Sequence, residues 1–494
     1  MKKLLMMSML AVAAMTAAAT ASGAIVATDG VASAKDATIP ACTSPAPVHT
    51  YAWLHCYGAP DIRAAYGVDQ LGNTATQEGL LGQGQTIVLI DSYGEPNGAA
   101  DLKAFHDAYF PNLPAPNYTA VYPNGSPDFK NVGNGQSGSS GAAGWAGEAA
   151  LDIEWSYAVA PLAHIVLIGV PPAETEGVQG FPNMFKAISD AIDTYPSGTV
   201  FSMSFGVTEQ TFGGATNQPA KFDAVFQKGI AKRDTFFASS GDNGSMGVSK
   251  KHRDSVNYNF PTDGWPASSP YVTAVGGTQL QYHWSWNPQS DVAFTSDGNY
   301  NPEYFGYTNN TTTNNVVWNE SWCPCATGGG PSFLYKRPAW QTGTGVLQTA
   351  GDHRLVPDLA WNAAVNGGVL VYTSFFPSIS RVGWHVYGGT SASSPQVAAL
   401  TALAVQQAGH GLGNINEAIY QHPSAFDDVI AQRQGPTSII SGDLSTNRMF
   451  DYIGDGLPVQ WDQILGWDTT GGYDMTTGLG TPNASAFVSA LVAP

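Results

Sequence analysis

Apolar runs alternate with helix-like stretches through the first half of the chain, and this alternation restricts the fold more than any other feature. The apolar runs are Gln85–Ile90, His164–Val170, Thr199–Phe205, Thr235–Gly241 and Tyr271–Thr278. The helical stretches are Glu148–Ala160, Met184–Thr194 and Ala220–Lys232. Strands covered on both faces read as continuous apolar segments, and parallel strands need a connecting helix. The sequence therefore predicts an α/β fold with a predominantly parallel central sheet and helices on both faces.

The first 24 residues have the features of a secretory signal peptide. Two lysines precede an alanine-rich apolar run, and small residues allow cleavage after Ala21 or Ala24. We expect residues 25–50 to form a short N-terminal segment and residues 51–494 to form one domain. No later segment has the long apolar run of a membrane span, so we expect a secreted protein, extracellular or periplasmic, without a membrane partner.

Acidic residues outnumber basic ones in this chain. It has 20 Lys and Arg against 38 Asp and Glu, a formal net charge of −18, and no basic cluster. These features disfavour nucleic acid as a partner. They also suit a protein that works in acid, where protonation of carboxylates reduces the net charge. We expect a monomer.

Four cysteines, Cys42, Cys56, Cys323 and Cys325, allow three disulfide pairings. Export would permit disulfides. A bond between Cys42 and Cys56 would close the N-terminal segment, whereas a bond between Cys323 and Cys325 would close a tight, strained ring. The sequence leaves the pairing open, and this spacing without a neighbouring histidine is a poor match to a zinc site.

The stretch Tyr387–Leu400 places a Gly-Gly-Thr-Ser turn before a helical pattern. Apolar residues recur at helical spacing from Ala392 to Gln407, so Ser391 should lie at a helix N-terminus. Unpaired backbone N–H groups and the helix dipole favour negative charge there, which suits a nucleophilic serine and an oxyanion beside it. The alternative is an ordinary N-cap, since serine is a preferred capping residue.

A serine nucleophile needs a base, and none of the ten histidines lies in a His-Gly-Thr-His segment. Glu148 and Asp152 are four residues apart in a predicted helix, which puts both carboxylates on one face. In a partly buried cleft such a pair can share a proton, and the raised pKa makes a base that works in acid. The alternative is a solvated helix face, although the neighbouring residues are mostly apolar.

Asp242 is a third candidate carboxyl group. It follows an apolar run and belongs to a Gly-Asp-Asn-Gly turn, at the sheet edge where α/β folds place their ligands. A protonated aspartate in a dry site can donate a hydrogen bond to an oxyanion. The alternative is a turn-forming aspartate without a chemical role.

Six motifs, in the same order along the chain, resemble those of the sedolisin family of serine-carboxyl peptidases, which has a subtilisin-like fold. They are E-x-x-x-D at Glu148–Asp152, SSGDNG, FPTDGWPASSPYVTAVGGT, VPDLAWNA, GGTSASSP and TGLGTPN. The resemblance implies that Ser391 is the nucleophile and Glu148 the general base and then general acid. Asp152 would orient Glu148, and Asp242 would be the oxyanion-hole acid. The implied activity is cleavage of protein or peptide substrates by a secreted serine-type endopeptidase in acid.

The resemblance also implies one structural calcium ion near the C-terminus. The family combines an aspartate, the carbonyl of the next residue and a Gly-x-Gly-x-Asp segment. The matching residues are Asp428, Val429, Thr470, Gly472 and Asp474, with threonine in place of the first glycine. Two carboxylates, backbone carbonyls and water would make the oxygen shell that Ca²⁺ prefers.

The chain departs from the family at its N-terminus. Family members carry a large prodomain that assists folding and blocks the site, whereas about 25 residues, from Ile25 to Thr50, separate the predicted signal peptide from the predicted domain here. That length is too short for an inhibitor with a fold of its own. We therefore expect either folding without a prodomain or some other form of control.

Two other functions remain as alternatives. A subtilisin-type peptidase is one, because Asp91 follows the first apolar run as a subtilisin aspartate would, and GTSxxSP also occurs in subtilisins. The missing histidine segment and the aspartate at position 242 disfavour it. The other is a catalytically silent binding protein on the same fold, although the four candidate catalytic residues are all present.

Overall fold

The structure is a computed structural model of the chain. It describes residues 25–27, 56–126, 142–170, 178–213, 217–249, 256–258, 260–282, 284–286, 305–307, 313–320, 325–346, 351–375, 382–430, 444–448, 450–452, 461–463 and 466–493. The predicted signal peptide, Cys42 and Cys323 lie outside these residues, so the signal peptide and the disulfide pairing stay predictions. Neither described cysteine, Cys56 or Cys325, is free.

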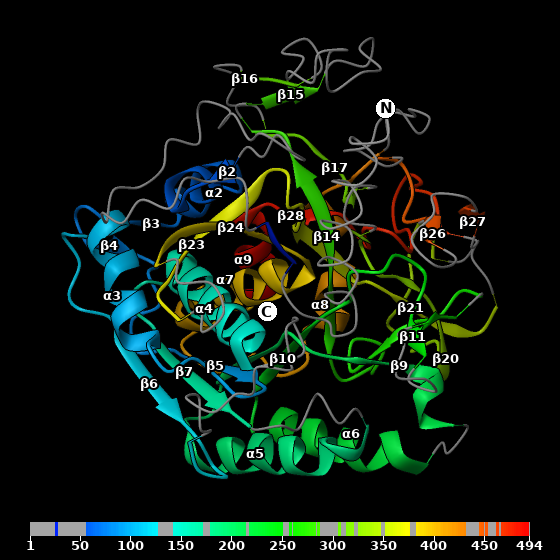
Figure 1. The fold of residues 1–494 in the computed structure, drawn as a ribbon, viewed down its shortest axis with the longest axis horizontal. Coiled ribbons are helices and arrows are strands. Elements are labelled where there is room, and N and C mark those ends of the chain that lie inside the picture. The colour runs from blue at the N-terminus through cyan, green and yellow to red at the C-terminus, as the bar shows by residue number, and fades with distance from the viewer. Residues whose placement is uncertain are drawn as a thin grey trace, which may run out of the picture.

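A central sheet runs through the middle of the molecule (Figure 1). Its order is β17-β14-β10-β8-β5-β7-β6, and β22 also pairs with β14. The strands are β5 (Thr86–Asp91), β6 (Asn117–Val121), β7 (His164–Gly169), β8 (Val200–Met203), β10 (Thr235–Ser239), β14 (Thr273–Leu280), β17 (Asn315–Val317) and β22 (Leu359–Asn362). Every pair is parallel except β14–β17. The predicted parallel α/β sheet is therefore confirmed.

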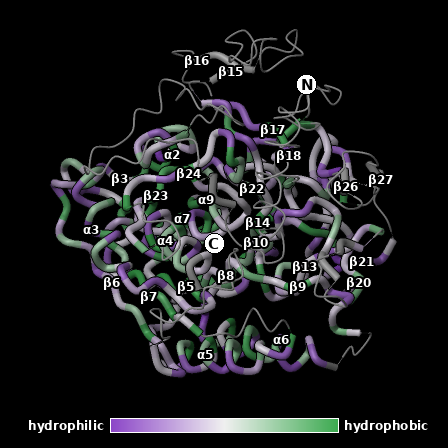
Figure 2. Tube along the Cα trace, viewed as in Figure 1, coloured by the Kyte–Doolittle hydropathy of each residue, from purple (hydrophilic) through white to green (hydrophobic). Residues whose placement is uncertain are grey.

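Helices cover both faces of this sheet. One face carries α2 (Ala59–Ala65), α3 (Gly98–Tyr109), α4 (Ala142–Val159), α7 (Thr390–Ala408) and α9 (Ala484–Val492), and the other carries α5 (Phe181–Thr194) and α6 (Asn217–Ala231). Strand β5 shows the division, because Ile87 and Leu89 join the first core while Val88 and Ile90 join the second. In Figure 2 the outer helix α5 carries both hydrophobic and hydrophilic colours, as expected of a helix with one buried face.

Helices α4 and α7 begin earlier than the sequence pattern predicts. The pattern indicates starts at Glu148 and Ala392, whereas the helices begin at Ala142 and Thr390. The added residues are mainly Gly, Ala, Ser and Thr, which contribute little to an apolar periodicity. As a result, Ser391 lies inside the first turn of α7.

A second sheet adjoins the start of α7. Its order is β1-β24-β23-β2, formed by β1 (Ile25–Ala27), β24 (Gly383–Gly388), β23 (Gly368–Thr373) and β2 (Cys56–Tyr57). Strand β24 is antiparallel to both of its neighbours. It leads into α7 through a single residue, Gly389.

Shorter elements complete the described chain. The helical ones are η1 (Val68–Gln70), η3 (Glu209–Phe212), α8 (Asn416–Gln421) and η4 (Pro423–Ala425). The strands are β3 (Gly72–Asn73), β4 (Glu78–Gly79), β9 (Val207–Thr208), β11 (Val248–Ser249), β12 (Val256–Asn257), β13 (Gly264–Trp265), β15 (Trp284–Trp286), β16 (Phe305–Tyr307), β18 (Asn319–Glu320), β19 (Cys325–Ala326), β20 (Gly330–Lys336), β21 (His353–Val356), β25 (Phe426–Asp427), β26 (Phe450–Tyr452), β27 (Trp461–Gln463) and β28 (Thr481–Pro482). Among the described residues, no helix combines the length and the apolar character that crossing a membrane requires.

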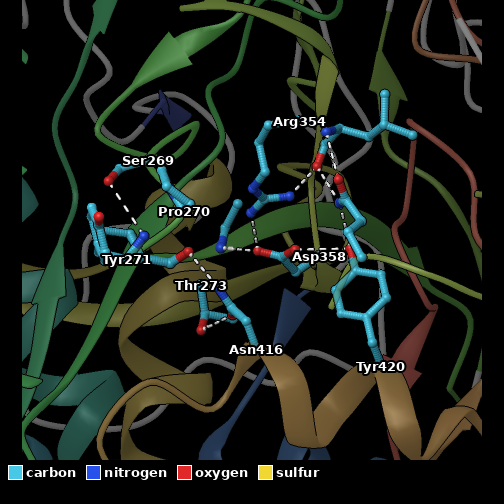
Figure 3. A network of polar contacts seen from close by, with 12 residues as sticks. Ser269, Pro270, Tyr271, Thr273, Arg354, Asp358, Asn416 and Tyr420 are labelled. Carbon is cyan, nitrogen blue, oxygen red and sulfur yellow. Dashed lines mark hydrogen bonds and ion pairs between the residues drawn. The ribbon is translucent and has the colours of Figure 1, made fainter. Parts of the chain in front are cut away.

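A buried polar network joins β14, β21 and α8 (Figure 3). The guanidinium of Arg354 forms an ion pair with Asp358, and neither side chain is exposed to solvent. Asp358 also accepts hydrogen bonds from the Ala274 N–H at 2.8 Å and from the Tyr420 hydroxyl at 2.9 Å. The network therefore ties β14, β21 and α8 together. It includes none of the predicted catalytic residues.

Candidate active site

The four predicted catalytic residues lie on elements that meet at the carboxyl edge of the central sheet. Glu148 and Asp152 are on α4, Asp242 follows β10, and Ser391 is in the first turn of α7. All four are buried, and the most exposed of them, Asp242, has only 5% of its surface accessible. Helix α4 packs against α7. The face of α4 that carries the two carboxyl groups is therefore not solvated, and the alternative of a solvated helix face is wrong.

The Asp242 carboxyl group is bonded to the start of α7. Its Oδ1 accepts hydrogen bonds from the N–H and the hydroxyl of Thr390, both at 2.8 Å. Within the described chain its Oδ2 has no hydrogen-bond partner. Burial raises the pKa of Asp242 to about 6, although the bonds from Thr390 lower it. Since Oδ1 is occupied as an acceptor, Oδ2 is the oxygen that would carry a proton and donate it to a hydrogen bond.

Gly389 permits this close approach between Asp242 and the helix. Its φ is +101°, a conformation that side chains rarely adopt, and a Cβ there would lie 2.9 Å from Asp242 Oδ2. Glycine is therefore favoured at position 389, because the side chain of a larger residue would collide with the Asp242 carboxyl group.

Two serines of one strand connect the two helices of the site. Ser204, directly after β8, donates a hydrogen bond to Asp152 Oδ1 at 2.9 Å. Ser202, inside β8, is 2.9 Å from the hydroxyl of Ser394, one turn along α7 from Ser391. Residues two apart in a strand point to the same face. One face of β8 therefore sets the position of Asp152 relative to the first turn of α7.

Asp91 is a further candidate, for which the sequence favours a structural role at the end of its strand and offers a functional role only in the subtilisin alternative. It is the last residue of β5, is fully buried, and has no hydrogen-bond partner for either carboxyl oxygen within the described chain. Burial raises its pKa to about 8. The pKa of Asp152 is raised mainly by burial and further by the negative charges of Asp91 and Glu148. The hydrogen bond from Ser204 lowers this pKa.

Asp91, Asp152 and Glu148 therefore form a row of interacting carboxyl groups, of which only some can be charged at once. The position of Asp91 at the carboxyl end of a buried parallel strand was the signal that could have identified it. Its electrostatic effect on Asp152 depends on the packing of α4 over β5, which the sequence pattern does not specify.

The Ser391 hydroxyl has no hydrogen-bond partner among the described residues. No described histidine is therefore bonded to it, and two of them are engaged elsewhere. His106 pairs with the Tyr157 hydroxyl at 2.6 Å, and His164 pairs with the Thr119 hydroxyl at 2.9 Å. Helix α4, which carries Glu148 and Asp152, packs against α7, the helix of Ser391.

A pocket of about 650 Å³, part of it open to solvent, adjoins Asp242. Its wall includes Gly206 after β8, Asp242 and Gly244 after β10, and Asp263 and Trp265 near β13. Burial raises the pKa of Asp263, and the charge of nearby Glu209 raises it further. The pocket is thus polar but lined by acids that are neutral in acidic solution, and it has room for a side chain of a bound peptide.

The two segments predicted to bind calcium lie side by side. The Gly472 N–H donates a hydrogen bond to Asp428 Oδ2 at 2.7 Å. Asp474 accepts hydrogen bonds from backbone N–H groups of its own segment, including that of Thr470 at 3.2 Å. No group of three or more His, Cys, Asp or Glu side chains in the described chain could hold a metal. The donors that are present, two carboxylates and the neighbouring carbonyl oxygens, fit a calcium ion rather than zinc.

The chain is similar to known proteins over most of its length. The sequence model of the subtilase family matches residues 82–426 of this chain. Kumamolisin from Bacillus sp. strain MN-32 is 31% identical over 360 residues, which make up 71% of this chain and 54% of that protein. Sedolisin from Pseudomonas sp. strain 101 is 29% identical over 294 residues, which make up 57% of this chain and 40% of that protein.

A solved structure of Pseudomonas sedolisin, a serine-carboxyl proteinase complexed with two molecules of pseudo-iodotyrostatin, has the same fold. Its TM-score is 0.59 at 23% identity, over 88% of this chain and 98% of that chain. This chain spans about half or less of the full length of kumamolisin and sedolisin. The match to the family over residues 82–426 and the likeness to these relatives confirm the predicted resemblance. The chain belongs to the subtilase family, in its sedolisin group.

Proposed function

We propose that the chain is a secreted serine-carboxyl peptidase that cleaves protein or peptide substrates in acid, through an acyl-enzyme on Ser391. The observation that carries the proposal is the row of buried carboxyl groups on α4 and β5, beside the first turn of α7. Such a row holds a proton where a histidine would stand in other serine peptidases. Membership of the sedolisin group supports peptide hydrolysis, and the predicted signal peptide supports secretion.

Acylation begins with Glu148 as the general base. Glu148 takes the proton of Ser391 Oγ while Oγ attacks the carbonyl carbon of the substrate, and a tetrahedral oxyanion forms. Asp242, protonated on Oδ2, donates a hydrogen bond to this oxyanion. Glu148 then gives the proton to the leaving nitrogen, and the C–N bond breaks. Water repeats the sequence on the acyl-enzyme, giving its proton to Glu148, which returns a proton to Ser391.

The pKa values set the expected pH range. Asp242 can donate to the oxyanion only while protonated, and burial raises its pKa to about 6. This donor is present below that pH and is lost as the pH rises through it. Asp91, with its pKa raised to about 8, keeps a proton in the row over the same range. We expect hydrolysis to be fastest in acid and to decline above about pH 6.

The first test is hydrolysis of casein by the purified chain between about pH 2 and about pH 9, with Ser391→Ala as the control. The proposal predicts a maximum in acid that depends on Ser391. A Ser391-dependent maximum near pH 8 would favour the subtilisin alternative and remove Glu148 as the base. Absence of hydrolysis at every pH would favour the binding-protein alternative.

A matched pair of glutamates on α4 tests the base. Glu148→Gln should lower kcat by roughly 10³-fold or more, since a general base is lost. Glu154→Gln is the control, because Glu154 is buried on the same helix and accepts a hydrogen bond from the Tyr372 N–H, which glutamine can also accept. Equal losses in the two variants would show that the helix, rather than the chemistry, is affected.

Calcium belongs to the proposal as one structural ion, held by the carboxylates of Asp428 and Asp474 and by the carbonyl oxygens of Val429, Thr470 and Gly472. It would neutralise two carboxylates and tie the two segments together. Calcium should then raise the melting temperature by a few degrees, and EDTA should reverse the effect. Asp428→Asn should abolish the shift, while its exposed neighbour, in Asp427→Asn, should leave it intact. A shift that survives Asp428→Asn would place the ion elsewhere.

A further inference from the structure

Strand β24 has a different partner on each side. On one side it pairs with β23 over most of its length, from Gly383 to Tyr387. On the other side it pairs with β1, residues Ile25–Ala27, which belong to the N-terminal segment. The sheet therefore ends in a strand that comes from outside the predicted domain.

The paired segment lies close to the predicted nucleophile. Ile25 is level with Gly388, and Ala27 is level with Val386. Gly388 stands three positions before Ser391. Because the strands are antiparallel, β1 starts at the end of β24 nearest Ser391 and runs away from it. A peptide in the same register would have its Ile25 position at the end of β24 that leads, through Gly389, into the first turn of α7.

The same part of β24 also contacts the helix of the predicted base. Tyr387, which is paired with Val26, places its hydroxyl against Gly147, where a Cβ would lie only 2.6 Å from the hydroxyl oxygen. Gly147 is the residue before Glu148 on α4. Strand β24, to which β1 is paired, thus contacts α4 next to the predicted base.

A peptide substrate needs this position for its leaving half. In a peptide cleaved at Ser391, the residues after the scissile bond run away from the nucleophile, which is the direction of β1. Extended peptides bind by adding a strand to a free sheet edge through main-chain hydrogen bonds. The outer edge of β24 can pair with only one strand at a time, so β1 and such a substrate exclude each other.

We propose that the N-terminal segment is a built-in competitive inhibitor, in which β1 occupies the edge of β24 that pairs with the leaving half of the substrate. This inference rests on the proposed peptidase function. The apparent substrate affinity is reduced by the fraction of molecules in which the edge is free. Because β1 pairs through only three residues, we expect it to compete reversibly with substrate. It provides a form of control that needs no folded prodomain.

Paired proline variants test the competition. Val26→Pro/Ala27→Pro removes the backbone N–H from two consecutive residues, one of which must be a hydrogen-bonded position of the ladder. Ser33→Pro/Ala34→Pro, in the same N-terminal segment but outside β1, is the control. The measurements are kcat and KM for casein peptides at the acidic optimum, and hydrogen exchange of the β24 amides in the Ser391→Ala background.

The first variant should show faster exchange in β24 and a kcat/KM raised roughly tenfold, mostly through KM. The control should match the parent chain in both measurements. Faster exchange with unchanged kcat/KM, or β24 amides that exchange equally fast in the parent chain, would overturn the inference while leaving the peptidase function intact. Absence of Ser391-dependent hydrolysis in every variant would overturn the proposed function, and the inference with it.

Discussion

Single residues in this site differ mainly in how burial and hydrogen bonding set their protonation. Asp242 is buried but accepts two hydrogen bonds from Thr390, which hold its pKa at about 6. Asp91 is buried with no hydrogen bond in the described chain, and its pKa is about 8. The same residue type thus titrates in two pH ranges, because hydrogen bonds stabilise the charged form of one carboxyl group and not the other.

Replacement of Asp242 tests the role of its free oxygen. In Asp242→Asn the amide oxygen can accept the Thr390 bonds and the amide N–H₂ can donate where a protonated Oδ2 would. Asp242→Ala lacks both groups and should lose about 10²- to 10³-fold in kcat. Asn should retain at least tenfold more activity than Ala, and the decline in kcat near pH 6 should disappear. A pH profile that keeps this decline in the Asn variant would assign it to another group.

Secondary-structure elements hold the site through a few buried side chains between them. The serines of β8 bond to α4 and α7, and Asp358 joins β14 to α8. These bonds link residues far apart in sequence, so each fixes the position of whole elements. A buried charged pair is costly to form but more costly to break, because the remaining charge loses its partner.

The Arg354–Asp358 pair gives a test at this scale. Arg354→Leu leaves Asp358 buried without its cation and should lower the free energy of unfolding by about 3–5 kcal/mol. The double variant Arg354→Leu/Asp358→Leu removes both charges and should be more stable than Arg354→Leu alone. Urea denaturation measures both values. A double variant less stable than the single one would mean that Asp358 supports the strands mainly through Ala274 and Tyr420.

The whole molecule buries many carboxyl groups with few cations. Burial raises the pKa of Asp223 to about 6, of Asp234 to about 7, of Asp91 to about 8 and of Glu95 to about 9. Of the ion pairs in the described chain, only Arg354–Asp358 is buried. Groups whose folded pKa is raised contribute stability that is fully present below about pH 4 and is lost as the pH rises through their folded pKa values.

The stability of the protein should therefore fall between about pH 4 and about pH 9, in a Ser391→Ala background that prevents self-digestion. Asp91→Asn should reduce this fall by as much as about 5 kcal/mol, because the amide has no charged form to bury. Asp69→Asn, at an exposed position, is the control and should leave the fall unchanged. Calorimetric melting at several pH values measures the effect. Equal falls in both variants would show that Asp91 is ionised or solvated in the folded chain.

The sequence by itself determined the sheet and most of the candidate site. Apolar runs and helical periodicity are properties of neighbouring residues, so they predicted five of the eight strands of the central sheet, β5, β7, β8, β10 and β14, and their parallel arrangement. They did not predict β6, β17 or β22. The same local patterns placed Ser391 at the start of a helix and Glu148 and Asp152 on one helix face. Motif order along the chain then indicated the sedolisin group, which the relatives confirm.

Only the tertiary structure decided how these parts meet. The electrostatic interaction of Asp91 with Asp152, the serine bonds beside and within β8, and the pairing of β1 with β24 join residues distant in sequence. The pKa values change because folding buries the carboxyl groups away from water. The edge of β24 is covered because folding brings β1 beside it. A local sequence pattern does not contain this information. The sequence around a strand or an aspartate is the same whether its neighbour in the folded chain is a carboxyl group or water.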